Sequence, residues 1–196
     1  MFLSHRRRTA LLFALTAGAP RAAEAHFEGS GIVPVLHGAS HALSLSGTLA
    51  VIAISLWFGS VDKQLARVGV VTLVLAWIVG MMLATITSAP ALAFVAPLSA
   101  AVSGALLALK RRPSEILTLL TTAAVGLVLG WIEGNGDLDP AERVGAVAAT
   151  SVVSIYAAVI AQAAAARGAN DLLRATGALI FLITPALAIR ALLRAS

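Results

Sequence analysis

From residue 43 onward, long apolar stretches alternate with short polar or turn-forming segments. Each stretch is close to the ~20 residues that a helix needs to cross a bilayer, and none has the short alternating pattern of a transmembrane β-strand. In lipid, every backbone polar group must be paired within a helix or a closed barrel. The pattern therefore predicts an all-α, polytopic membrane protein. Its six transmembrane helices are expected at about 43–59, 68–87, 91–109, 115–132, 144–166 and 174–193.

The first 25 residues have the order of a cleavable signal peptide. A basic HRRR sequence at 5–8 precedes an apolar stretch at 9–19, and Ala-Glu-Ala at 23–25 fits a small-residue cleavage site. The alternative is an uncleaved anchor helix, but this apolar stretch is shorter than a span and a Gly-Ala-Pro sequence interrupts it. We therefore expect a signal peptide at 1–25 and a six-helix transmembrane domain at 26–196.

Positive charges fall unevenly on the two sides of the predicted membrane domain. With the mature N-terminus outside, the predicted cytoplasmic side carries Lys63, Arg67, Lys110, Arg111, Arg112, Arg167 and Arg174, and the outer side carries Arg143, Arg190 and Arg194. This is the asymmetry of the positive-inside rule. It predicts a multi-pass protein of the bacterial inner (cytoplasmic) membrane whose mature N-terminus lies on the periplasmic side.

Composition agrees with lipid as the main solvent and excludes several functions. Hydrophobic residues make up 59% of the chain and charged residues only 12%, against about 25% charged residues in soluble domains. The absence of cysteine excludes disulfides, thiolate metal sites and cysteine nucleophiles. Without the predicted signal peptide, 10 basic residues face 8 acidic ones, so no basic surface for nucleic acid is expected.

Candidate chemistry lies outside the spans. We find no ionisable residue near the middle of any predicted span, which argues against a proton relay of carboxylates. His37 and His41 are spaced to lie on one side of a helix, and cleavage would leave His26 with a free amine beside its imidazole. Imidazole and oxygen ligands suit nickel, cobalt, zinc or copper. We predict a divalent-metal site of His26, His37, His41 and Glu133, with Asp137 as an auxiliary ligand.

The same residues have two other interpretations. The histidines are also suited to a membrane interface, and the acidic stretch of Glu133, Asp137, Asp139 and Glu142 to simple solvation. Ser40 lies between His37 and His41, but no oxyanion hole or third orienting group accompanies it. We therefore expect no enzymatic activity and no resident cofactor.

Several motifs resemble the HupE/UreJ family of hydrogenase/urease accessory membrane proteins. They are Ala-Glu-Ala before His26, FEGSGIVPVLHGASHALSL at 27–45, and Leu56-Trp57 near the end of the first span. Family members carry His, five residues, then Asp-His; here His37 is followed by Leu43-Ser44. Their second motif, Phe-His-Gly-x-Ala-His-Gly-x-Glu, corresponds to VLGWIEGNG at 128–136, which retains both glycines and replaces the histidines by Leu129 and Glu133. The resemblance implies a nickel or cobalt permease that serves metalloenzyme maturation.

Two functions follow as hypotheses. The first is a divalent transition-metal permease or metal-binding accessory protein in the lipid bilayer. The second is a structural subunit that binds no metal and packs in a larger membrane complex or a homo-oligomer. The uncharged spans and their alanine- and glycine-rich faces favour helix association of that second kind.

Overall fold

The computed structural model describes residues 32–86, 95–109, 114–136 and 138–195, and every regular element within these ranges is an α-helix. The helices are α2 (Val33–Ala42), α3 (Leu45–Gly59), α4 (Lys63–Ala84), α5 (Val95–Leu109), α6 (Glu115–Gly134), α7 (Pro140–Ala166) and α8 (Asn170–Ala195). The predicted all-α class is confirmed. The predicted signal peptide at 1–25 lies outside the described residues.

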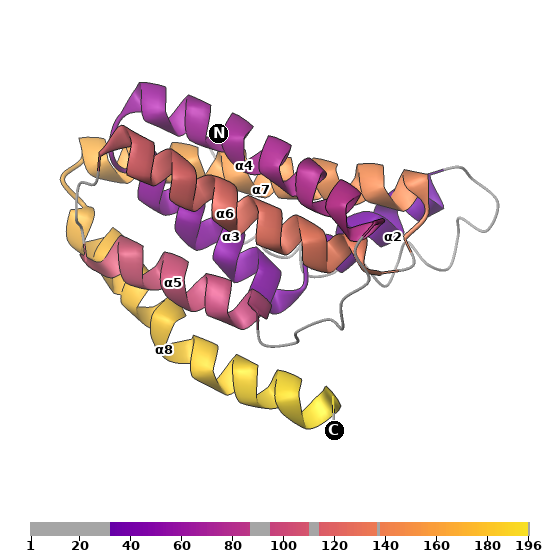
Figure 1. Cartoon of the computed structure of the whole chain (residues 1–196). Coiled ribbons are helices and arrows are strands. Elements are labelled where there is room, and N and C mark those ends of the chain that lie inside the picture. The colour runs from indigo at the N-terminus through magenta and orange to yellow at the C-terminus, as the bar shows by residue number, and fades with distance from the viewer. Residues whose placement is uncertain (1–31, 87–94, 110–113, 137, 196) are drawn as a thin grey trace, which may run out of the picture.

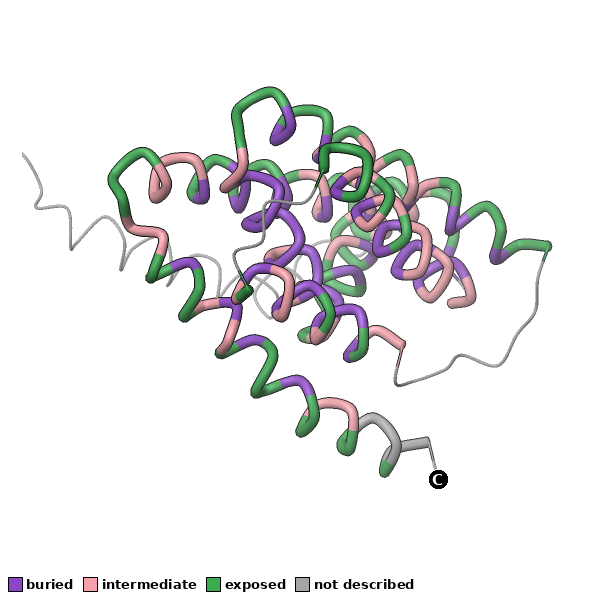
Figure 2. Tube along the Cα trace, turned by 60° about the vertical axis from the view of Figure 1, so that its left-hand side comes forward, coloured by how far each residue is buried: buried purple, intermediate pink, exposed green. Residues whose placement is uncertain are grey.

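Helix α3 forms the centre of the bundle (Figure 1). It packs against α4, α5 and α7, while α4 pairs with α6, α5 with α8, and α2 with α7. Every residue from Ala53 to Gly59 is buried, and Phe58 and Ile54 are among the largest fully buried side chains. Burial is concentrated on this central helix, and the outer helices turn exposed faces outward (Figure 2). An apolar helix without a polar face thus takes the central position.

Glycines let α4 and α6 approach closely. Gly126, Gly130 and Gly134 recur every four residues along one face of α6. A Cβ atom added at Gly130 would lie 2.0 Å from the carbonyl oxygen of Trp77, and one at Gly80 would lie 2.2 Å from that of Leu127. Small residues of this kind permit backbone contact between helices in lipid, where packing rather than water drives association.

Four helices are long and apolar enough to cross a membrane by themselves: α4, α6, α7 and α8 as far as Arg190. A fifth candidate is α2 with α3, a pair bent by 72°. Helix α5 has 15 residues and is about 22 Å long, short of the ~30 Å hydrocarbon core. The chain is therefore a membrane protein with four or five candidate spans in its described part, and six spans remain a prediction.

The helices α4 and α7 begin earlier than the apolar stretches predict. The Asp62 side chain accepts hydrogen bonds from the backbone N–H groups of Gln64 (2.7 Å) and Leu65 (2.9 Å). It thereby caps α4, which starts at Lys63 rather than at 68. Helix α7 starts at Pro140 rather than at 144, with Asp139 as its cap. Polar caps extend these helices beyond their apolar stretches because they satisfy the first backbone donors.

Candidate metal-binding site

Helix α2 carries both candidate histidines of the described region. It begins with proline in its first turn and ends at Ala42, before the chain bends into α3. The segment preceding α3 is thus helical, as the spacing of His37 and His41 requires. Their side chains are 62% and 47% exposed, so both rings are accessible from outside the bundle.

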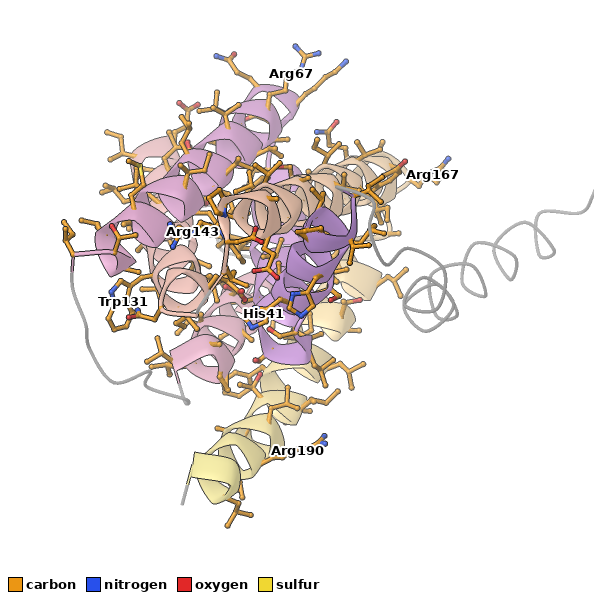
Figure 3. The ribbon with its side chains drawn as sticks, turned by 90° about the vertical axis from the view of Figure 1, so that its right-hand side faces the viewer. His41, Arg67, Trp131, Arg143, Arg167 and Arg190 are labelled. Carbon is orange, nitrogen blue, oxygen red and sulfur yellow. The ribbon has the colours of Figure 1, made fainter. Side chains whose placement is uncertain are left out.

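His41 contacts the buried carboxylate of Glu133, which lies in the last turn of α6. His41 Nδ1 is 2.6 Å from Glu133 Oε2, and the Glu133 side chain is only 7% exposed. An ionised carboxylate only accepts hydrogen bonds, so with Glu133 ionised the ring donates its Nδ1–H. In Figure 3, which views this end of the molecule, His41 lies close to the ends of α6 and α7.

His37 makes the corresponding contact with Glu142, in the first turn of α7. Nδ1 of His37 is 2.5 Å from Glu142 Oε1. The other carboxylate oxygen of Glu142 accepts the Asp139 backbone N–H at 2.8 Å, and the Asp139 side chain accepts the Glu142 N–H at 2.8 Å. This reciprocal pair is a capping box. It fixes the Glu142 carboxylate with one oxygen directed at the histidine.

Two glycines bring α2 and α7 close enough for that contact. A Cβ atom added at Gly38 would lie 1.8 Å from the carbonyl oxygen of Glu142. One added at Gly145 would lie 1.8 Å from the carbonyl oxygen of Val35. The helices therefore cross in backbone contact, and His37, beside Gly38, reaches the start of α7.

The hydrogen bonds determine what each ring offers to a ligand. A neutral imidazole that donates from Nδ1 carries its lone pair on Nε2. Histidine ligands of metals are typically held this way, with the second nitrogen donating to a carboxylate. Within the described ranges, no group of three or more histidine, aspartate or glutamate side chains is placed to hold a metal ion. The two histidine–glutamate pairs are thus at most part of a ligand set.

The sequence-predicted residues divide into three groups. Glu133 and His41 are brought together, whereas His37 contacts Glu142, which the sequence indicated only as part of the acidic stretch. The remaining predicted ligands, His26 and Asp137, lie outside the described residues. A signal for Glu142 was present, because Asp139-Pro140-Ala141-Glu142 has the spacing of a capping box.

Comparison with known proteins places this site within a family match. The model described as HupE / UreJ protein matches residues 12–187, which is most of the chain. The searches of curated proteins and of solved structures found no match to this chain. The matched range includes α2, the end of α6 and the start of α7, which together carry both histidine–glutamate pairs.

Proposed function

Because the chain belongs to the HupE/UreJ family, we propose that it is a permease or metal-binding accessory protein for a divalent transition-metal ion of the nickel or cobalt type. This family comprises membrane accessory and transport proteins, and it is associated with nickel and cobalt. The observation that supports the proposal best is the pair of accessible histidines one helical turn apart, each with Nδ1 bound by a glutamate.

The proposed ligands are the Nε2 atoms of His37 and His41. Two histidines at this spacing on one helix face can bind one metal ion together, as in zinc-binding helices with the same spacing. Glu133 and Glu142 are then positioning residues that fix the rings and raise their basicity. His26 and Asp137 remain the proposed sources of further ligands, since two imidazoles alone do not complete a coordination sphere.

The histidine side chains are more exposed than the glutamate side chains behind them, which suits capture of an ion from outside the bundle. The histidine rings are 62% and 47% exposed, whereas the carboxylates behind them are 15% and 7% exposed. An arriving cation therefore meets the imidazoles first, and it is attracted by two carboxylates that the bundle holds in place. We place this face on the periplasmic side of the inner membrane, where the distribution of Lys and Arg predicts the mature N-terminus.

Isothermal titration of nickel, cobalt, zinc and copper into the purified full chain tests the proposal. We expect at least one metal to bind with a Kd below about 100 μM, and we expect the combined His37→Ala, His41→Ala variant to lose that binding. Ser40→Ala is the matched control, because Ser40 lies between the histidines on α2 and donates only to the His37 carbonyl oxygen.

The alternative is a structural subunit that binds no metal. It is favoured by the backbone contacts at glycines between α4 and α6 and between α2 and α7, since small residues of this kind promote helix association in lipid. If no metal binds below about 100 μM, or if binding survives loss of both histidines, the permease proposal fails and this alternative takes its place.

A further inference from the structure

Arg143, in the first turn of α7, lines a groove between α7 and the end of α4. The groove has a volume of about 470 Å³ and is lined by Val79, Met82, Leu83, Thr85, Ile86 and Arg143. We name it the Arg143 groove. Nε–H of Arg143 donates to the carbonyl oxygen of Leu138 at 3.2 Å, and no ion pair found among the described residues includes its guanidinium. Figure 3 shows Arg143 close to the ends of α4 and α6.

Apart from Thr85, the rest of the Arg143 groove is an apolar stripe formed by the last turns of α4 and by Ile86. Val79, Met82 and Leu83 lie on one face of α4, and Ile86 follows in the turn after the helix ends at Ala84. Met82 and Ile86 are the most exposed of the four, at 65% and 78%. Its helical part, from Val79 to Leu83, extends about 6 Å along α4. Because α4 is a candidate membrane span and these side chains are exposed, we expect the stripe to face lipid. An acyl chain is the apolar partner that a bilayer offers there.

A second, more polar depression adjoins the Arg143 groove. It shares Thr85 and Arg143 with the groove and adds Asn135, Gly136 and Asp139, among others. Asp139 is exposed, and only its Oδ1 is shown accepting a hydrogen bond, from the N–H of Glu142. One cationic and one anionic side chain therefore line adjacent hollows at the end of an apolar stripe.

We propose that the Arg143 groove binds a phospholipid with an ethanolamine headgroup. The guanidinium donates to the phosphate oxygens in the forked geometry that suits such groups. The primary ammonium donates to the Asp139 carboxylate, and one acyl chain lies along the α4 stripe. A choline headgroup has no N–H to donate, and a glycerol headgroup has no cation for Asp139. Charge complementarity excludes the glycerol headgroup, and the need for an N–H donor to Asp139 excludes choline, so the two criteria together select ethanolamine.

Native mass spectrometry of the full chain in detergent tests this selection. The protein is titrated with phosphatidylethanolamine, phosphatidylglycerol and phosphatidylcholine of identical acyl chains. We expect the ethanolamine lipid to bind at least about tenfold more tightly than either other lipid, as the loss of a charged hydrogen bond implies. Arg143→Gln should lower its affinity about tenfold, and Arg143→Lys, which keeps the charge without the fork, should lower it less.

Asp139→Asn and Arg190→Gln serve as the specificity and control variants. Asn retains helix-capping ability, so Asp139→Asn should preserve α7 while it equalises binding of the ethanolamine and choline lipids. Arg190 is an exposed arginine near the end of α8, and its replacement should leave lipid binding unchanged. Equal binding of the three lipids by the unaltered chain, or equal losses in Arg143→Gln and Arg190→Gln, would overturn the proposal. Nickel titration of the same variants reports separately on the histidine site.

Discussion

Replacing Glu133 by Gln should weaken nickel binding about tenfold while the hydrogen bond to His41 remains. The Gln carbonyl oxygen can still accept from Nδ1, which is 2.6 Å from the carboxylate oxygen in the structure. A charge-assisted hydrogen bond is roughly twice as strong as a neutral one, so the substitution removes about 1–1.5 kcal/mol. That is a factor of about 5–13 in Kd. Water will replace little of the lost hydrogen-bond energy, because the Glu133 side chain is only 7% exposed.

Isothermal titration of nickel into the purified variant measures this effect. The matched control is Glu115→Gln, the same substitution in the first turn of the same helix, where Glu115 is exposed. Nickel binding by Glu133→Gln that equals that of the unaltered chain would refute a positioning role for Glu133, and so would an equal loss in Glu115→Gln. A loss beyond about a thousandfold would make Glu133 a direct ligand, since second-shell changes typically cost 10–100-fold.

Three further sets of substitutions test contacts at the site and packing within the bundle. Gly38→Ala should lower the free energy of unfolding by about 3 kcal/mol in a thermal unfolding experiment, because its Cβ would lie 1.8 Å from the Glu142 carbonyl oxygen. Gly168→Ala should lower it by only about 1 kcal/mol, because a Cβ there meets no atom within 4 Å and the only strain comes from its φ of 72°. Glu142→Ala should lose about 1 kcal/mol of stability together with nickel affinity, whereas Glu142→Gln retains the capping box and should lose affinity alone. Ser55→Ala breaks the buried 2.9 Å hydrogen bond to Ser154, and a double-mutant cycle with Ser154→Ala should give a coupling of about 0.6–1.7 kcal/mol; zero coupling would contradict the bond.

Membrane insertion makes much of this fold readable from sequence. Helix α6 was expected at 115–132 and spans Glu115–Gly134, because both ends of the apolar stretch carry polar residues. The 72° bend between α2 and α3 was not predicted, since Leu43 and Ser44 carry no proline or glycine signal. The bend accompanies the close crossing of α2 and α7, a contact between segments about a hundred residues apart.

The candidate site shows the same division between local and distant information. The helical spacing of His37 and His41 is local and was predicted. Their partners Glu133 and Glu142 are 92 and 105 residues away along the chain, and no spacing rule pairs residues at that separation. The family's histidine position at Glu133 supplied a hint for one partner. The capping-box pattern places the other partner, Glu142, at the start of a helix. Only the backbone contact of α2 with α7 at Gly38 and Gly145 brings that helix start to His37.

Nickel K-edge X-ray absorption of the metal-loaded full chain tests the proposed ligation by His37 and His41 most directly. Imidazole rings give a distinctive scattering pattern, so the number of histidine ligands can be fitted. We expect at least two imidazoles in the unaltered chain, one fewer in either His37→Ala or His41→Ala, and two fewer in the combined variant. Coordination by oxygen alone, or an imidazole count that the combined variant leaves unchanged, would contradict metal binding by this histidine pair.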